Sequence, residues 1–259
     1  MQTWLAFYLS GRKYSPGLNS FFDQCWEAYN SSVYRGLEMG DIERLRQRLI
    51  SDQTVIQRTD FGARGHLNYD QRISNLAKLS LSPRPQMLFL SSLAHINHSR
   101  VIVEMGTCLG LGTAYLAQAN PHAQVLTLEG DPKLADWAKS HWEDLKISNI
   151  NLLVGSFYNT LEQALQLLPP VDFIFLDGHH DGTAMQRYWH TIKPYLAPGA
   201  IVCVDDIRWS ADMFHFWTTL RHDPNVIGSI DGGKIGLCKL RNMLSTTSVH
   251  ITWPGLPTY

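Results

Sequence analysis

Short apolar runs alternate with amphipathic stretches along the chain from Val101 onward. A run such as VIVEM at 101–105 is typical of a strand buried on both faces of a parallel sheet. Each of five such runs is followed by a segment with helical periodicity. This repeated β-α pattern predicts a doubly wound α/β fold with helices on both faces of the sheet. The strands are expected at 101–105, 124–129, 151–155, 172–177 and 200–206.

The last two apolar runs are arranged differently. VIGSI at 226–230 and IGLCKL at 235–240 are separated by only four residues, 231–234. That distance allows a hairpin but not a crossover, so the sheet is predicted to end in an antiparallel pair. We therefore expect a Rossmann-like, mostly parallel seven-stranded sheet whose last strand is antiparallel.

The first hundred residues are expected to form a mainly helical N-terminal extension. One helix is predicted at 42–50 with Asp41 as its cap. A second is predicted at 69–79, and a third opens at Pro83 and Pro85 and runs to about Ile96. The predicted domains are the N-terminal extension at 1–98, the α/β core at 99–243 and a tail at 244–259.

Composition narrows the possible partners. The 259 residues are 44% hydrophobic and 17% charged, with a formal net charge of −1. These values are ordinary for a globular protein, and no cluster of Lys and Arg suggests a nucleic-acid partner. The apolar runs are too short to cross a membrane, and the N-terminus lacks the basic region of a signal peptide. None of the four cysteines forms a CxxC pair, so we expect a reduced, cytoplasmic protein, with a homodimer as one option.

A glycine-rich loop follows the first predicted strand directly. Its sequence at 104–113 is EMGTCLGLGT, with glycines at 106, 110 and 112. Glycine lets a backbone turn sharply and approach a ligand closely. The spacing differs from the dinucleotide pattern G-x-G-x-x-G, and no Gly-Lys-Ser/Thr follows as in a Walker A loop. Glu129 ends the next strand, where a carboxylate can bind both hydroxyls of a ribose. These features favour an adenosyl ligand without a pyrophosphate over a tight turn with no ligand.

The segment VEMGTCLGLGTAYLA resembles motif I of the class I S-adenosylmethionine-dependent methyltransferases, and LTLEGD resembles their motif II. The resemblance implies that the loop contacts the methionine part of S-adenosylmethionine, while Glu129 holds the ribose. Catechol-type relatives often carry Ser or Thr in place of Gly112, so Thr113 or backbone N–H groups would bind the methionine carboxylate here. The residues expected to bind the cofactor are Glu104, Gly106, Thr107, Gly110, Gly112, Thr113, Glu129, Gly155, Ser156, Phe157 and Asp177. Among them, Gly155, Ser156 and Phe157 are expected to flank the adenine.

Carboxylates gather at the ends of the fourth and fifth predicted strands. Asp177 ends the fourth strand, and Asp205 and Asp206 end the fifth. These strands should be neighbours, so the three side chains would meet at the edge where this fold binds ligands. Three carboxylates repel one another unless a cation or proton lies between them, and oxygen ligands suit Mg²⁺, Ca²⁺ or Mn²⁺. Alternatively, Asp177 is a helix cap or an acid on the cofactor side, and Asp206 is a helix cap.

This arrangement resembles the metal-dependent O-methyltransferases of the catechol type. The resemblance implies that Asp177, Asp205 and Asp206 are metal ligands, and it places His180 where those enzymes have a catalytic Lys. A neutral His can take the proton of a substrate hydroxyl, and a metal on that oxygen would acidify it. Methyl transfer then depends mainly on positioning. His180 and Asp177 are the predicted catalytic residues, although His179 and His180 can also be solvated loop residues.

A wider resemblance, to bacterial class I methyltransferases of unassigned substrate, runs from about residue 40 to 240. It rests on the order DFGARG, RISNLAKLSLSP, VIVEMGTCLGLGT, FIFLDGHHD and VDDIRWS. Residues 62–65 would then form a lid over the cofactor or an ordinary loop. We predict an S-adenosylmethionine-dependent methyltransferase that acts on oxygen of a small molecule, with metal assistance. A non-catalytic cofactor-binding module is the main alternative, and the glycine spacing disfavours an NAD(P)-dependent oxidoreductase.

Overall fold

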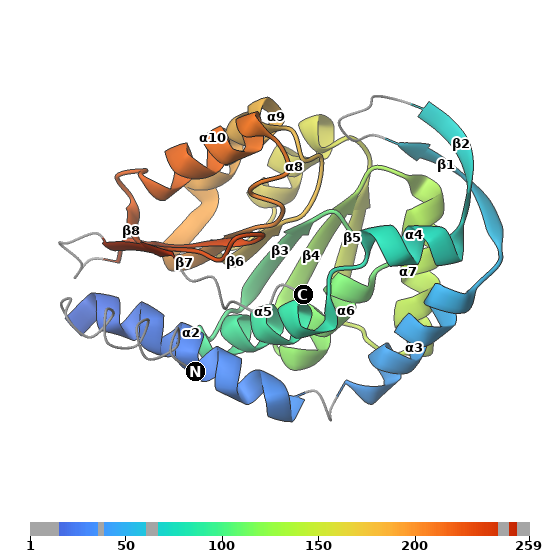
Figure 1. Cartoon of the computed structure of the whole chain (residues 1–259), viewed down its shortest axis with the longest axis horizontal. Helices are drawn as coiled ribbons and strands as arrows, with labels where there is room; N and C mark the ends of the chain where they lie inside the picture. The colour runs from blue at the N-terminus through green and yellow to red at the C-terminus, as the bar shows by residue number, and fades with distance from the viewer. Residues whose placement is uncertain (1–15, 36–38, 61–66, 243–248, 253–259) are drawn as a thin grey trace.

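The computed structural model describes residues 16–35, 39–60, 67–242 and 249–252 (Figure 1). The helices are α2 (Pro16–Arg35), α3 (Gly40–Ser51), α4 (Ile73–Ser80), α5 (Arg84–Ile96), α6 (Leu111–Ala119), α7 (Pro132–Asp144), α8 (Phe157–Gln166), α9 (Gly182–Ile192) and α10 (Ala211–Arg221), with a 3₁₀ turn at Lys193–Tyr195. The strands are β1 (Val55–Asp60), β2 (Leu67–Arg72), β3 (Val101–Met105), β4 (Gln124–Glu129), β5 (Ile150–Val154), β6 (Val171–Leu176), β7 (Leu196–Val204), β8 (Val226–Asp231), β9 (Gly236–Leu240) and β10 (Val249–Thr252).

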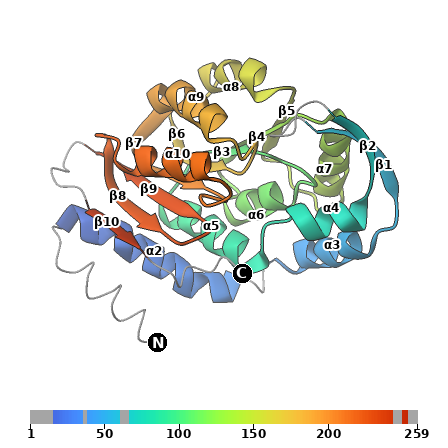
Figure 2. The ribbon, with the colours of Figure 1, turned by 45° about the horizontal axis from the view of Figure 1, so that its top comes forward.

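The central sheet has the strand order β10-β8-β9-β7-β6-β3-β4-β5. Strands β3 to β7 are parallel to their neighbours among themselves, whereas β9 is antiparallel to both β7 and β8. The predicted mostly parallel sheet with an antiparallel last strand is confirmed in β3 to β9. An eighth strand, β10, was not predicted, and it lies parallel to β8 at the sheet edge (Figure 2).

Successive residues of each strand pack against opposite faces of this sheet. On β3, Ile102 joins the core beneath α2 to α7, while Val101 and Val103 join the core beneath α8, α9 and α10. Figure 1 shows these helix layers on either side of the strands. Because both faces are covered, the apolar side chains of β3, β6 and β7 are buried at consecutive positions. Within the described residues, no helix is long and apolar enough to cross a membrane.

The N-terminal part follows the prediction only in part. Helices α3 and α5 lie where they were expected, but Met39 occupies the N-cap of α3. Asp41 instead lies in the first turn, where it pairs with Arg44. The predicted helix at 69–79 is wrong before Ile73, since its start belongs to β2. Strands β1 and β2 form a separate antiparallel hairpin, and residues 62–65 lie outside the described part of the chain.

Candidate functional site

The carboxylate of Glu104 occupies the interior beneath the glycine-rich loop. Its Oε2 accepts hydrogen bonds from the hydroxyls of Thr113 and Thr127, the latter at 2.8 Å. Burial raises the pKa of Glu104 to about 7, although both hydroxyls oppose this shift. A Cβ at Gly112 would lie only 2.7 Å from Glu104 Oε1. Position 112 is therefore glycine because Glu104 fills the space, and the Thr113 hydroxyl is engaged with that same carboxylate.

Replacement of Gly112 by alanine is expected to lower the free energy of unfolding by about 1–3 kcal/mol, because Glu104 has to leave a well-packed position. Urea denaturation measures the change. Gly40→Ala is the matched control, since among the described residues its Cβ would meet only Arg44, at an ordinary 3.6 Å. Equal stability of the two variants would mean that Glu104 does not shape position 112.

The loop itself connects β3 to α6 and begins against the end of β6. Gly106 has a φ of +106°, and a Cβ there would lie 2.9 Å from the carbonyl carbon of Asp177. The Asp177 N–H donates to the carbonyl of Met105 at 2.9 Å. Gly110, with φ +79°, forms the N-cap of α6, and a Cβ there would meet Ala138 at 2.8 Å. The glycines thus allow close backbone approach, which brings the loop against Asp177.

Glu129 lies nearly buried at the end of β4, facing the loop. Its two oxygens accept hydrogen bonds from the N–H groups of Cys108, at 2.7 Å, and Asp131, at 2.9 Å. Burial raises the pKa of Glu129, while these two N–H groups hold the pKa back. Each carboxylate oxygen can accept a second hydrogen bond. The Glu129 carboxylate is thus oriented between the loop and Asp131. Beside it, the hydroxyl of Thr107 in the loop forms a 2.6 Å hydrogen bond with the hydroxyl of Thr127 on β4.

The residues predicted to flank an adenine follow β5, the neighbour of β4. Gly155 has a φ of +143° and donates its N–H to the carbonyl of Glu129 at 2.8 Å. Ser156 is the N-cap of α8. The Phe157 ring lies against Gly178, where an added Cβ would come within 2.8 Å of the ring. The structure therefore brings this segment between Glu129 and the residue after Asp177.

Asp177 and Asp205 lie at the adjacent ends of β6 and β7. The Asp205 N–H donates to the carbonyl of Leu176 at 3.0 Å. Burial raises the pKa of Asp177 well above its usual value, and the nearby Asp205 raises it further. The hydroxyl of Ser82 donates to Asp177 Oδ2 at 3.1 Å, a contact that sequence reasoning missed.

Lys234 is the second residue that sequence reasoning missed. Its Nζ lies 2.6 Å from Asp205 Oδ2 and 3.3 Å from Asp206 Oδ1. Burial alone would lower the pKa of Lys234, but the neighbouring carboxylates, Asp205 foremost, together outweigh burial and raise this pKa. Within the described residues, no group of three or more His, Cys, Asp or Glu side chains is placed to hold a metal ion. The three predicted metal ligands, Asp177, Asp205 and Asp206, therefore lie near one another, but around the ammonium group of Lys234.

His180 lies at the partly exposed side of the cluster formed by Asp177, Asp205 and Asp206. Its Nδ1 is 3.9 Å from Asp206 Oδ2, and its ring centroid is 5.6 Å from that of the exposed Trp209. The backbone φ is +73° at His179, +31° at His180 and +50° at Asp206. Such left-handed conformations at non-glycine residues cluster at functional sites. The capping alternatives do not hold, since Asp181 caps α9 and Ser210 caps α10.

Comparison with known proteins agrees with this geometry. Residues 103–207 match a family model described as a methyltransferase domain. The chain is 28% identical over 137 residues to a catechol O-methyltransferase of Niastella koreensis, covering 52% of this chain and 61% of that protein. It is 29% identical over 136 residues to one of Mycobacterium tuberculosis, covering 52% and 60%. The chain therefore spans about 60% of the length of these curated relatives.

Solved structures show the same fold. An O-methyltransferase from Bacillus cereus in complex with SAH is 25% identical, with a TM-score of 0.56 over 65% of this chain and 86% of that one. TomG from Streptomyces achromogenes, an O-methyltransferase in complex with SAM, is 21% identical with a TM-score of 0.54, over 63% and 82%. Residues 103–207 are thus similar in sequence to a methyltransferase domain, and the strand order and the loop with Glu129 resemble those of the class I S-adenosylmethionine-dependent methyltransferases. Within that class, the two curated relatives and the Bacillus cereus protein are O-methyltransferases.

Proposed function

We propose that this protein transfers a methyl group from S-adenosylmethionine to an oxygen of a small molecule. The observation that carries the proposal is the Glu129 carboxylate, oriented beside the β3–α6 loop whose Gly106 lies against Asp177. When bound, the cofactor supplies a methyl group on a positively charged sulfur. The Glu129 carboxylate accepts hydrogen bonds from the ribose hydroxyls. Gly155, Ser156 and Phe157 border the adenine.

The methionine end of the cofactor would meet the start of α6. Thr113 is fully buried and engaged with Glu104, so its hydroxyl is not the donor. The first N–H groups of a helix lack intrahelical partners and favour an anion. We therefore assign the carboxylate of the methionine part to backbone N–H groups around Gly110 and Gly112.

The acceptor would lie between the carboxylates and His180. The imidazole of His180 receives the proton of the acceptor hydroxyl, and the Asp206 carboxylate lies 3.9 Å from its Nδ1. Trp209, 63% exposed beside His180, supplies a flat apolar wall suited to an aromatic acceptor. The catechol O-methyltransferases among the relatives make phenols and catechols the first acceptors to test.

A divalent cation does not fit the described arrangement. Its ligands would have to be Asp177, Asp205 and Asp206, and the ammonium of Lys234 already lies against the last two. A divalent ion on Asp205 and Asp206 would have to share their oxygens with this ammonium, and the two cations would repel each other. No step of the proposed reaction therefore passes through a metal.

Location and assembly belong to the same proposal. The four cysteines are free in the structure, which supports a reduced, cytoplasmic protein. The boundaries at 98 and 243 are proposed as well, with the strand pairing of β10 linking the tail to the core. A homodimer is left to measurement.

Replacement of Glu129 by alanine tests the cofactor site. We expect S-adenosylhomocysteine to bind about 100-fold more weakly, because hydrogen bonds to a charged carboxylate contribute roughly 1.5–3 kcal/mol each. Titration calorimetry measures the affinity. Glu162→Ala, an exposed acid on α8, is the matched control and should bind as the wild type does. Unchanged affinity in the Glu129 variant would contradict the site.

Catalysis is tested separately with radiolabelled S-adenosylmethionine and a panel of phenols and catechols. Label in an O-methylated product supports the proposed function. Normal S-adenosylhomocysteine affinity without transfer to any acceptor would favour the non-catalytic module instead.

A further inference from the structure

The turn between β8 and β9 carries Lys234 into the carboxylate cluster. The Asp205 side chain is only 3% exposed, so its negative charge has little contact with water. Burying an unpaired carboxylate is costly, and a cation at 2.6 Å offsets that cost. Its charge also acts on Asp177, whose pKa it lowers against the stronger effects of burial and of Asp205. The ammonium group of Lys234 therefore pairs with two carboxylates and acts electrostatically on a third.

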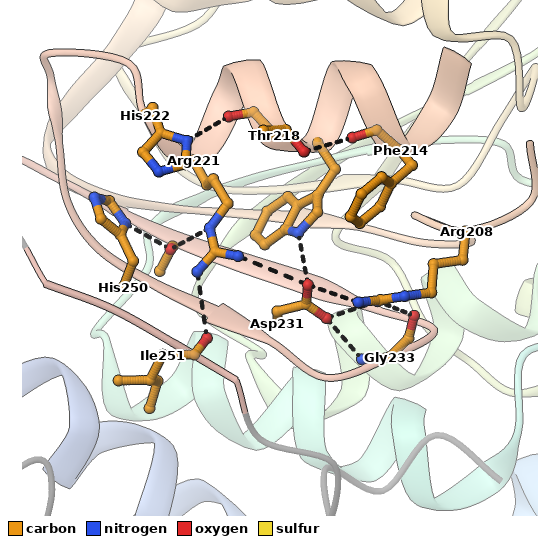
Figure 3. A network of polar contacts seen from close by, with 11 residues as sticks. Arg208, Phe214, Thr218, Arg221, His222, Asp231, Gly233, His250 and Ile251 are labelled. Atoms are coloured by element: carbon orange, nitrogen blue, oxygen red, sulfur yellow. Dashed lines mark hydrogen bonds and ion pairs between the residues drawn. The ribbon is translucent and has the colours of Figure 1, made fainter. Parts of the chain in front are cut away.

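The position of this ammonium is fixed by the turn that bears it. The guanidinium of Arg208 donates to both oxygens of Asp231, at 2.7 and 2.9 Å, and to the carbonyl of Gly233 at 2.7 Å. Asp231 in turn accepts from the Gly233 N–H at 3.1 Å (Figure 3). The carbonyl of Lys234 accepts from the Ile207 N–H at 2.9 Å. The turn is thus held against the segment that follows β7, which also bears Asp205 and Asp206.

The ammonium group of Lys234 can donate a hydrogen bond to one further ligand. An ammonium has three N–H donors, and the contacts described for Lys234 go to Asp205 and Asp206. The side chain is 26% exposed, so its end is reachable from the side where His180 lies. Asp205 Oδ1 is buried without a hydrogen-bond partner among the described residues, which leaves one acceptor in the cluster unused.

We infer that Lys234 is the resident cation of this site and replaces the divalent metal of the metal-dependent relatives. This inference rests on the proposed methyl transfer to oxygen. The third N–H of Lys234 holds the acceptor oxygen, and its positive charge stabilises negative charge developing there. The oxygen forms a bond to the methyl carbon, the carbon–sulfur bond breaks with its electron pair left on sulfur, and the hydroxyl proton passes to His180. Lys234 stays protonated throughout.

Binding of Mn²⁺, followed by the electron paramagnetic resonance signal of the free ion, tests the placement without requiring activity. Lys234→Met removes the charge and keeps the length, so its carboxylates should bind Mn²⁺ at least about tenfold more tightly than those of the wild type. Lys234→Arg keeps the charge and should behave like the wild type. Lys193→Met is the matched control, because Lys193 pairs with Asp223 elsewhere on the fold.

Two outcomes would overturn the inference. One is equal Mn²⁺ affinity in the wild type and the Lys234→Met variant. The other is micromolar Mn²⁺ binding by the wild type that Asp205→Asn abolishes, since Lys234 would then yield to a metal. If Lys234→Met does not fold, Lys234→Gln takes its place, because an amide can still donate to Asp205. S-adenosylhomocysteine affinity, measured on the same samples, reports separately on the proposed function.

Discussion

Replacement of Gly106 by alanine is expected to lower the free energy of unfolding by about 3–5 kcal/mol. Two costs add up. A left-handed backbone costs a non-glycine residue roughly 1–3 kcal/mol, and Gly106 has a φ of +106°. The new Cβ would also lie 2.9 Å from the carbonyl carbon of Asp177, and closer still to its oxygen. Overpacking against backbone costs about 1–3 kcal/mol more, because a peptide group cannot rotate away as a flexible side chain can.

Gly233→Ala separates these two costs. Gly233 also has a left-handed φ, of +93°, but an added Cβ there would meet no atom of the described residues within 4 Å. It should therefore lose only the conformational part, about 1–2 kcal/mol. Urea denaturation of both variants gives the comparison. If they were equally destabilised, the close approach of the β3 and β6 ends would not be what requires glycine at 106.

The parallel sheet could be predicted because its signal is local. Strands β3, β4, β6 and β7 are covered on both faces, so a largely apolar run marks each of them. The glycine loop was also visible in the sequence, but the reason for Gly112 was not. That reason depends on the side-chain position of Glu104, which no pattern of residue types encodes. Strands β1 and β2 were missed because they form a hairpin outside the main sheet, with exposed residues such as Val55 and Tyr69.

Partners far apart in the sequence explain the rest of the difference at the site. Lys234 contacts Asp205 across 29 residues, and Ser82 contacts Asp177 across 95. In the sequence, Lys234 follows Asp-Gly-Gly in a tight turn, where a lysine is usually solvated. Only the antiparallel pairing of β9 with β7 brings that turn beside the end of β7. Asp177, Asp205 and Asp206 could thus be predicted to converge, but the cation they meet could not.

Asp231→Asn is expected to lower the free energy of unfolding by about 3 kcal/mol, as is usual when one partner of a buried ion pair is removed. The Asp231 side chain is 4% exposed and binds Arg208, the indole N–H of Trp217 at 3.1 Å and Arg221 at 3.7 Å. Figure 3 shows Arg208 and Arg221 converging on the carboxylate. An amide cannot accept from all of them, and it leaves Arg221, itself 15% exposed, without its counter-charge.

The pH dependence of this loss identifies its cause. Burial alone would raise the pKa of Asp231, but the hydrogen bond from Arg208 and its other donors hold it below the ordinary 3.8. The carboxylate therefore stabilises the folded state fully above about pH 4, and this contribution disappears as the pH falls through the lowered pKa. The difference in stability between the wild type and Asp231→Asn should be constant at neutral pH and shrink below pH 4, in urea titrations at each pH.

Asp136→Asn, at an exposed position on α7, is the matched control and should change stability by no more than about 0.5 kcal/mol at any pH. A loss for Asp231→Asn that persisted unchanged below pH 4 would point to packing and not to charge.

The same variant also reports on Lys234. Since Asp231 and Arg208 hold the turn that carries this lysine, a loosened turn would let Mn²⁺ compete for Asp205, so Asp231→Asn should bind Mn²⁺ more tightly than the wild type.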